Sequence, residues 1–509
     1  MPSQGFLDHL TDQAALRPHG TALVFREERV TYGDLLSTAQ DLRTQLADLG
    51  LPAGRPVALS VKKSPGAIAL VIALLMERRQ ILLPSPELGE DVLQTLGRQA
   101  SCSHVLTVST EPGGGRPTVG AREVAGPPGA EGFVLPPAAQ ASLFLTTSGS
   151  TGTPKIVPLL GAAVDNFLDW GAGQFTVAPG TSVLSYAPLN FDLSLLDVWS
   201  TLAAGGKVVL VDQDRATDPA YLLGLFEQEG PEVVQAVPMF YRLLAEAAEA
   251  AEAARPDGPV FGQARHVIFT GDAMPYALLT RLTALFPAAR FHNLFGCTET
   301  NDSLMHTVDA ERLSPDEKIP IGRPLPGVDA LLLDEDGRII PGEGTGELLV
   351  ATPFQTSGYL ETARNEGVFV PHPDGAHLGA YYRTGDMVTR RQDGAYVLEG
   401  RNDFHVKVRG VRTNMQEVEQ VILQHPDVRE AAVVALPDEL AGVRLHALVQ
   451  RREGSGLGGL SLRTHCAASL PRPAIPGSIV VGDVPLPRTP TGKPDRNLIK
   501  KNQTERNAA

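Results

Sequence analysis

Short hydrophobic runs alternate with longer amphipathic segments between residues 181 and 295. Such runs are typical of buried strands, and segments with an apolar residue every three or four positions are typical of helices. Because strands that alternate with helices form a parallel sheet covered on both faces, we expect an α/β domain. The predicted strands are 181–188, 207–212, 232–238, 264–271 and 289–295, and the predicted helices are 193–205, 219–230, 277–286 and a segment that begins at Met239.

The N-terminal part of the chain follows the same pattern. We expect a strand at 21–25, an amphipathic helix that follows Thr31 as its N-cap, and a second strand at 55–61. The apolar run 66–76 is too short to cross a bilayer, so we interpret it as a buried core helix. Residues 110–138 are rich in glycine and proline, which predicts a long loop.

The pattern changes after residue 320, where short strands separated by glycine and proline turns replace the alternation. A further break falls at Gly400–Asp403, and a unit of about 105 residues with its own strands and helices follows it. We therefore expect a large domain at residues 1–402 and a small α+β domain at residues 403–509.

Composition and charge narrow the class of protein. A chain of 509 residues is too long for a single core, and its 43% hydrophobic and 20% charged residues are those of an ordinary globular protein. The net charge of −14 disfavours nucleic acid and anionic membrane surfaces as partners. Cys102, Cys297 and Cys466 lack metal or disulfide spacing, and the N-terminus has no signal-peptide pattern, so we expect a cytoplasmic protein.

The segment Thr146–Lys155, TTSGSTGTPK, carries the clearest chemistry. It combines six hydroxyl side chains, two glycines and one lysine behind an apolar run. Glycines allow backbone N–H groups to turn toward an anion, and the lysine adds a full charge. The spacing of a Walker A loop is absent. Taken alone, the segment fits a surface turn as well as a polyphosphate-binding loop.

Four further segments follow in the chain: FGCTET, YRTGD, GRNDFHVKVRG and PTGKPDR. Together with TTSGSTGTPK, and in this order, they resemble the adenylate-forming enzymes, a superfamily that includes nonribosomal-peptide adenylation domains, acyl-CoA synthetases and luciferases. The resemblance covers nearly the whole chain. It implies a large N-terminal domain of parallel sheets layered with helices, a small barrel-like subdomain, and a small mobile C-terminal domain. Departures from the family pattern fall at 77–84, Cys297 and His405.

The resemblance also implies a reaction, in which a carboxylate attacks the α-phosphorus of ATP and expels pyrophosphate. Both reactants are anions, so positive charge and Mg²⁺ are needed. Glu299 would hold Mg²⁺, Thr298 would contact the α-phosphate, and Lys493 would carry the chemical step. Without the resemblance, a solvated loop lysine is the favoured interpretation of Lys493. The residues implied in ATP binding are Thr147, Ser148, Gly149, Ser150, Thr151, Gly152, Lys155, Asn293, Phe295, Gly296, Asp386, Arg401 and Lys493.

Two positions relate to the expected motion of the small domain. The resemblance makes Asp403 a hinge about which this domain rotates between adenylation and thioester formation, and places Gly410 at the pantetheine tunnel in the second state. An aspartate in a turn with no associated motion is the alternative for Asp403.

The segment 190–199 resembles the start of the amino-acid pocket in peptide-synthetase adenylation domains. Asp192 falls on the aspartate that pairs with the substrate ammonium; alternatively, it caps the following helix. Asp302 and Ser303 could bind a hydroxyl or amine of the substrate side chain, or could point at solvent. The start of the pocket is similar to that of stand-alone prolyl and alanyl enzymes, which favours proline or alanine. The predicted pocket residues are Asp192, Leu193, Leu196, Met239, Thr270, Leu294, Asp302 and Ser303.

We therefore expect a ligase that forms an aminoacyl-adenylate and transfers the aminoacyl group to a phosphopantetheine thiol. The sequence ends about 16 residues after Lys493, so we expect the carrier to be a separate protein. Ser461 lies in a segment that looks like a carrier motif, but we interpret it as the N-cap of a helix inside the small domain. An acid:CoA ligase is the alternative enzyme, and a non-catalytic binding subunit is the alternative of another class.

Overall fold

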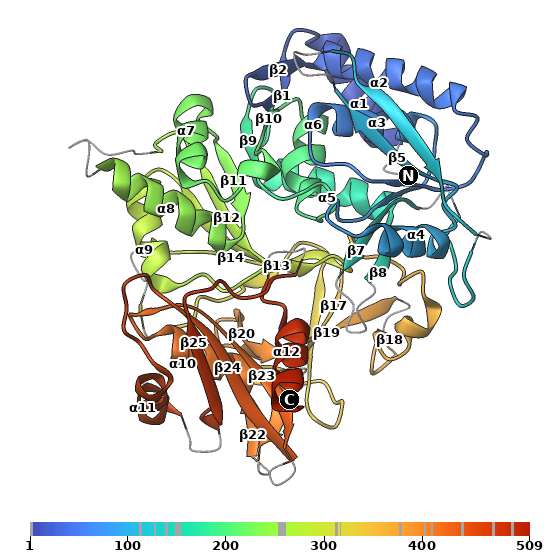
Figure 1. The fold of residues 1–509 in the computed structure, drawn as a ribbon. Coiled ribbons are helices and arrows are strands. Elements are labelled where there is room, and N and C mark those ends of the chain that lie inside the picture. The colour runs from blue at the N-terminus through green and yellow to red at the C-terminus, as the bar shows by residue number, and fades with distance from the viewer. Residues whose placement is uncertain are drawn as a thin grey trace. The chain divides into compact units, whose positions relative to one another are not determined.

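The computed structural model forms two compact units (Figure 1). The first comprises residues 1–344, 349–383 and 390–397, and the second comprises residues 345–348, 384–389 and 398–509. Residues 402–403, at the predicted domain boundary, lie outside the described residues, so the boundary stays a prediction. The structure describes residues 4–110, 115–126, 129–137, 141–147, 154–252, 261–310, 314–315, 317–375, 379–401, 404–408, 411–438, 442–470, 474–489 and 493–508.

A nine-stranded sheet forms the centre of the first unit. Its inner strands pair in parallel, which confirms the parallel sheet predicted for residues 181–295, and the strands at both edges pair antiparallel. Near-continuous runs of Val, Ile, Leu and Phe suit strands that are buried on both faces. The order is β15 (Arg323–Pro324), β14 (Asn301–Thr307), β13 (Arg290–Cys297), β12 (His266–Thr270), β11 (Val233–Ala236), β9 (Ser182–Ser185), β10 (Lys207–Leu210), β1 (Thr21–Phe25) and β2 (Glu28–Thr31).

A six-stranded sheet is the second sheet of this unit. The long loop predicted at 110–138 is wrong in part, because residues 118–123 form an edge strand that pairs antiparallel with the strand before it. This edge strand is largely exposed, and within it only Val119 packs against the core, so its hydrophobic pattern does not reveal it. The order is β6 (Thr118–Glu123), β5 (His104–Ser109), β3 (Val57–Leu59), β4 (Ile81–Leu83), β7 (Ala141–Thr147) and β8 (Lys155–Leu160).

Helices cover both faces of the nine-stranded sheet and of the six-stranded sheet. Val208 and Leu210 of β10 pack into the core between the two sheets, whereas Val209 packs into the core on the outer face. The first unit is therefore layered as helix, sheet, helix, sheet, helix. The middle layer is α1 (Gln4–Leu16), α2 (Tyr32–Asp48), α3 (Pro65–Met76), α5 (Gly161–Gln174), η1 (Leu195–Ser200) and α6 (Thr201–Ala203); α7 (Pro219–Glu229), α8 (Pro238–Glu252) and α9 (Tyr276–Leu285) cover the nine-stranded sheet, and α4 (Glu90–Gln99) covers the six-stranded sheet.

Two of the predicted helices have the cap or the burial that we expect, and a third differs in helix type. Thr31 caps α2 in a reciprocal capping box with Asp34, and α3 is buried from Gly66 to Leu75. The helix predicted at 193–205 is instead a π-helix over 195–200, continued by the short α6. Such π-helical turns occur often at functional sites.

The region after residue 320 forms a five-stranded sheet. Its strands run in the order β16, β17, β19 and β18, and β20 pairs with β19. Elsewhere in the first unit, the short 3₁₀ helix η2 (Gln213–Arg215) lies in a connecting segment, and η4 (Thr362–Asn365) lies before β18. The strands are β16 (Asp329–Leu333), β17 (Gly344–Ala351), β18 (Phe369–Pro371), β19 (Ala380–Arg390) and β20 (Tyr396–Arg401).

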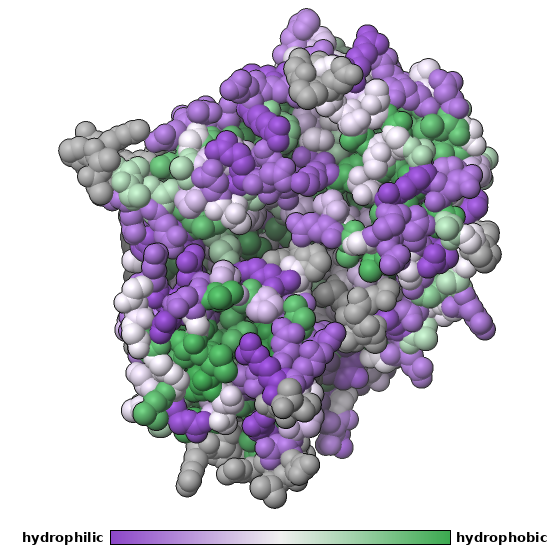
Figure 2. All heavy atoms as spheres, in the orientation of Figure 1, coloured by the Kyte–Doolittle hydropathy of each residue, from purple (hydrophilic) through white to green (hydrophobic). Residues whose placement is uncertain are grey.

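The C-terminal unit has a three-stranded sheet with helices on both faces. Helices α10 and α11 pack on one face, and Ile499 of α12 packs on the other. Figure 2 shows hydrophobic side chains gathered over the edge strand β25. Ser461 is not an N-cap, because α11 begins at Gly459. The elements are β21 (His405–Val408), β22 (Val411–Asn414), α10 (Met415–Leu423), β23 (Val428–Asp438), β24 (Gly442–Arg451), α11 (Gly459–Ser469), β25 (Ser478–Gly482) and α12 (Arg496–Ala508).

Within the part of the chain that the structure describes, no helix has both the length and the apolar character that a membrane crossing requires.

A buried histidine pair links β12 to β13. Nδ1 of His266 lies 3.0 Å from Nε2 of His292, and Nδ1 of His292 lies 3.1 Å from Oγ1 of Thr307. His292 is only 3% exposed, and burial, helped by the neighbouring imidazole of His266, lowers its pKa to about 4. Both rings are therefore neutral at pH 7.

Acid is expected to destabilise the first unit through this pair. The folded pKa of His292, about 4, lies below the unfolded value of 6.5, so the unfolded chain binds more protons between these pH values. The free energy of unfolding therefore falls as the pH drops through this window, by about 3 kcal/mol in full. Denaturant titrations of the parent and of His292→Asn at pH 7, 6 and 5 should show the stability gap narrowing with acid. A gap that is independent of pH would contradict this origin.

Candidate active site

The carboxyl ends of four parallel strands gather the residues predicted for the amino-acid pocket. β9, β11, β12 and β13 run parallel, and their register places Thr270, at the end of β12, beside Leu294 of β13. In open α/β sheets, ligands bind in the crevice outside the carboxyl ends of the strands. The segments that follow these ends carry the other predicted pocket residues, which are Asp192, Leu193, Leu196, Met239, Asp302 and Ser303.

Asp192 lies half-buried in the segment between β9 and the π-helix η1. Its Oδ1 accepts a hydrogen bond from the N–H of Leu193 at 3.0 Å. The N-cap position of η1 belongs to Ser194, so Asp192 does not cap this helix as the alternative interpretation required. Its role in the pocket stays a prediction.

Asp302 shares the electrostatic environment of Asp192. Burial, followed by the negative charge of Asp192, raises the pKa of Asp302 well above its usual range. The protonated, neutral form of Asp302 is therefore favoured.

The remaining predicted pocket residues differ in how much they expose. Leu193 and Met239 are half-buried, whereas Leu196 is fully buried against α5, where a Cβ on Gly171 would lie 2.7 Å from its Cδ1. The hydroxyl of Ser303, on β14, donates to Oγ1 of Thr300 in the preceding turn at 3.1 Å. Leu193 and Met239 are therefore the apolar members with side-chain surface left to offer a ligand.

A tight hairpin between β13 and β14 presents Thr298 and Glu299. The N–H of Thr300 donates to the carbonyl three residues earlier at 3.0 Å, which closes the turn. Asn301 follows with a left-handed φ of 51°, a conformation that asparagine tolerates well. A Cβ at Gly296 would lie 2.1 Å from the carbonyl oxygen of Asn301, so only glycine fits there.

The carboxylate of Glu299 is 5% exposed and meets a tyrosine hydroxyl. Tyr359 donates to its Oε1 at 2.5 Å, and Nζ of Lys155 lies 3.4 Å from the same hydroxyl and 4.7 Å from the ring centroid. Burial, and then the Glu299 charge, raises the pKa of Tyr359 above its usual range, so the hydroxyl keeps its proton. The predicted phosphate lysine and the predicted metal carboxylate therefore contact the same tyrosine.

The donor set around Glu299 fits Mg²⁺. Among the described residues, no three His, Cys, Asp or Glu side chains converge as an all-protein metal cage would require. Mg²⁺ keeps several waters and is usually held by one or two carboxylates together with substrate phosphates. A single buried carboxylate beside a phosphate lysine suits that mode of binding.

The residues on either side of the predicted phosphate loop pair with each other on two neighbouring strands. Thr147, the last residue of β7, pairs with Lys155, the first residue of β8. The buried hydroxyl of Thr147 has no hydrogen-bond partner within the described residues. The predicted residues between them, Ser148, Gly149, Ser150, Thr151 and Gly152, lie outside the described residues.

Comparison with known families shows to which protein family this chain belongs. The model described as AMP-binding enzyme matches residues 10–360, and the model described as AMP-binding enzyme C-terminal domain matches residues 417–493. The chain belongs to the AMP-binding enzyme family. It is an adenylate-forming ligase.

Individual relatives agree with this membership. An L-proline–[L-prolyl-carrier protein] ligase of Pseudomonas fluorescens is 30% identical over 96% of this chain and 97% of its own length. A D-alanine–D-alanyl carrier protein ligase of Bacillus velezensis is 32% identical over 70% of each chain. The structure of ATP-bound MatB from Rhodopseudomonas palustris has the same fold, with a TM-score of 0.81, 21% identity and 99% coverage of both chains.

Two residues that the family resemblance assigns to the nucleotide are paired in this AMP-binding enzyme. Nη1 of Arg401 donates to Oδ1 of Asp386 at 3.2 Å, within the second unit. Gly385, next to Asp386 in the chain, has a φ of 73°, and a Cβ there would lie 3.1 Å from the Arg401 guanidinium. The YRTGD segment therefore needs its glycine for both conformation and space.

Lys493 lies shortly before helix α12 in the C-terminal unit. Its side chain is exposed, and its carbonyl accepts from the N–H of Thr489 at 2.8 Å. Arg496 anchors the following helix through a bidentate ion pair with Glu419, at 2.8 and 2.6 Å. The main chain at Lys493 and the start of α12 are thus held in place, while the Lys493 ammonium is left to solvent. The predicted hinge Asp403 and the predicted tunnel residue Gly410 lie outside the described residues.

Asn293 and Phe295 flank Leu294 on β13. Both are half-buried, and Nδ2 of Asn293 donates to the carbonyl of Pro320 at 2.8 Å. Their assignment to ATP stays a prediction.

The sequence does not single out a buried lysine that supports the pocket segment. Nζ of Lys63 donates to the carbonyls of Ser185 and Ala187 at 2.5 and 2.8 Å, just after β9. Burial lowers the pKa of Lys63 and raises that of Asp197 on η1, and each charge partly offsets the other's burial. A lysine in a polar tripeptide gives no sequence signal for this role, because its partners are backbone carbonyls more than 120 positions away.

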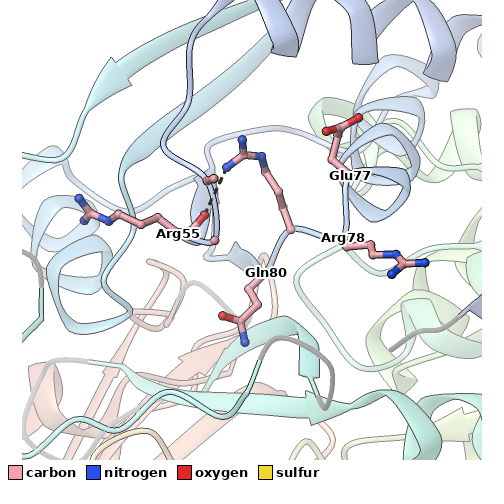
Figure 3. Close-up of a pocket in the computed structure, with 7 residues that line it drawn as sticks. Arg55, Glu77, Arg78 and Gln80 are labelled. Carbon is pink, nitrogen blue, oxygen red and sulfur yellow. Dashed lines mark hydrogen bonds between the residues drawn. The ribbon is translucent and has the colours of Figure 1, made fainter.

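A cavity of about 160 Å³ lies beside β3 and β4 and is lined by residues 53–55 and 77–80 (Figure 3). Arg55 and Arg78 point away from each other in Figure 3. The guanidinium of Arg79 donates to the carbonyls of Pro52 and Leu51, at 2.9 and 3.1 Å. Arg79 therefore stabilises the neighbouring loop, and the three arginines do not converge on an anion. The cavity coincides with the segment 77–84 that departs from the family pattern.

Proposed function

We propose that this enzyme activates a small amino acid, with proline or alanine favoured, as its aminoacyl-AMP. It then transfers the aminoacyl group to the phosphopantetheine thiol of a separate carrier protein. The observation that carries the proposal is Asp192, a half-buried carboxylate beside the carboxyl ends of the central strands, where a substrate ammonium would find a partner. The proline and D-alanine carrier-protein ligases among the relatives support the choice of substrate and acceptor.

In the first half-reaction, ATP occupies the loop between β7 and β8 and the hairpin that carries Glu299. Lys155 and the loop hydroxyls bind the β- and γ-phosphates, Thr298 contacts the α-phosphate, and Asp386 accepts from the ribose hydroxyls. Glu299 would hold Mg²⁺, which would supply positive charge to the phosphate oxygens. Asp192 holds the substrate ammonium, which aims the substrate carboxylate at the α-phosphorus.

The chemical step forms one P–O bond and breaks another. A carboxylate oxygen of the amino acid attacks the α-phosphorus, and the bridging oxygen leaves with pyrophosphate. This step brings the negatively charged carboxylate and α-phosphate together. The ammonium of Lys493 stabilises the negative charge that results. In this proposal Asp403 is the hinge at the boundary between domains 1–402 and 403–509, and it lets the C-terminal domain leave after adenylation.

In the second half-reaction, the pantetheine sulfur attacks the carbonyl carbon of the adenylate. The carbon–sulfur bond forms, the bond from the carbonyl carbon to the phosphate oxygen breaks, and AMP leaves. The thiol proton passes to solvent.

Pyrophosphate exchange tests the proposal directly. ATP, Mg²⁺ and labelled pyrophosphate are incubated with the enzyme and a panel of amino acids, aryl acids and fatty acids. We expect exchange with a small neutral amino acid, proline or alanine first. Exchange with simple acids alone would favour the acid:CoA ligase, and no exchange with any member of a broad panel would favour a binding subunit. Transfer to a phosphopantetheinylated carrier, followed by mass spectrometry, tests the acceptor.

A further inference from the structure

Tyr359 connects two predicted functional groups that lie far apart in the sequence. Its hydroxyl donates to Oε1 of Glu299 at 2.5 Å, and Nζ of Lys155 lies 3.4 Å from the same oxygen. The side chain is only 4% exposed, so these contacts are made away from bulk water. A hydrogen bond to a charged group contributes more than one between neutral groups.

The backbone around Tyr359 is held in one place. Its N–H donates to Oδ1 of Asn365 at 2.7 Å, and Nδ2 of Asn365 donates back to its carbonyl at 3.1 Å. Gly358 has a φ of 137°, and a Cβ there would lie 2.9 Å from the same Oδ1. The ring also meets Phe369 edge-on at 5.7 Å. The hydroxyl is therefore presented by a rigid segment.

The geometry gives the hydroxyl two consequences for Glu299. It commits Oε1 to a fixed partner, so the carboxylate cannot rotate freely and its second oxygen keeps one direction. The tyrosine also contacts the Lys155 ammonium with its ring face and hydroxyl, at 4.7 Å from the centroid and 3.4 Å from the oxygen. Opposite charges in a buried site attract strongly. Without the hydroxyl, the ammonium could pair with Glu299 directly.

We propose that Tyr359 is a positioning residue that orients Glu299 for the metal and keeps Lys155 from neutralising it before ATP arrives. This inference rests on the proposed function, in which Glu299 holds Mg²⁺ and Lys155 binds phosphate. In this inference Tyr359 acts through its contacts with Glu299 and Lys155.

The test replaces Tyr359 with phenylalanine, which keeps the ring and removes the hydroxyl. Two quantities are measured: the free Mg²⁺ concentration that gives half-maximal pyrophosphate exchange at saturating ATP, and the affinity of the enzyme–ATP complex for Mn²⁺ by electron paramagnetic resonance. We expect Tyr359→Phe to raise the Mg²⁺ requirement about tenfold and to weaken Mn²⁺ binding by a similar factor. The KM for the amino acid should stay within about twofold of the parent.

Tyr381→Phe is a matched control. Tyr381 is also buried, and its hydroxyl donates to a carboxylate oxygen of Asp329 at 2.5 Å. Loss of this bond should lower the melting temperature of Tyr381→Phe about as much as that of Tyr359→Phe. Both metal readouts of Tyr381→Phe should stay at parental values. If Tyr359→Phe behaves in the same way as Tyr381→Phe, the positioning role is wrong and Tyr359 is structural.

Glu299→Gln separates the two hypotheses. If Glu299→Gln weakens Mn²⁺ binding and Tyr359→Phe does not, the inference about Tyr359 fails while the proposed role of Glu299 stands. If Glu299→Gln itself keeps parental Mn²⁺ affinity, the metal-binding part of the proposed function is wrong.

Discussion

Replacing Lys493 with alanine is expected to reduce aminoacyl-adenylate formation by about 10²–10³-fold while ATP still binds. That factor is typical for the loss of one preorganised donor that stabilises charge in a transition state. The side chain is exposed in the C-terminal unit, and its carbonyl is bonded to Thr489. The substitution therefore removes an ammonium without opening a cavity. Single-turnover adenylate formation and equilibrium ATP binding measure the two effects separately.

Lys500→Ala provides the matched control for Lys493→Ala. Lys500 is another exposed lysine of the same unit, on α12, so its loss changes the net charge equally. We expect parental adenylation in this variant. Equal rates in the parent and Lys493→Ala would remove Lys493 from the chemical step. Equal losses in both lysine variants would point to the net charge of the unit instead.

The parallel sheet could be predicted because burial on both faces requires near-continuous apolar strands, as in residues 207–210 and 266–270. The edge strand β6 could not, because its residues 118–123 are largely exposed and within it only Val119 packs against the core. The π-helix at 195–200 was predicted as an ordinary helix. All six of its residues are buried, so polar and apolar positions show no periodicity that would distinguish a π-helix from an α-helix.

Motif residues of the site were recognisable because they combine glycine, hydroxyl and charged side chains in short segments. Gly296 and Gly385 illustrate this, since each is needed where another backbone or side chain approaches closely. Tyr359 and Lys63 were not predicted. Their roles come from contacts with residues far away in the chain, Glu299 and Ser185, and a single tyrosine or lysine has no local pattern that announces such a contact.

Replacing Asp192 with asparagine is expected to lower kcat/KM for the preferred amino acid by roughly 30- to 5,000-fold. The range corresponds to about 2–5 kcal/mol, the cost of truncating one partner of a buried, hydrogen-bonded charge pair. Asparagine keeps the shape of the side chain and can still accept from the N–H of Leu193. The loss should therefore reflect the missing charge opposite the substrate ammonium. Amino-acid-dependent pyrophosphate exchange, with the KM for ATP measured in parallel, checks it.

Asp302→Asn is the control that makes the Asp192 result specific. Burial and the charge of Asp192 raise the pKa of Asp302, so its neutral acid already resembles asparagine in shape and charge. We expect this variant to keep kcat/KM within about threefold of the parent. If Asp302→Asn is as damaging as Asp192→Asn, the charge that meets the substrate is shared between the two carboxyl groups. If Asp192→Asn retains parental turnover, the ammonium contact is absent and the substrate need not be an amino acid.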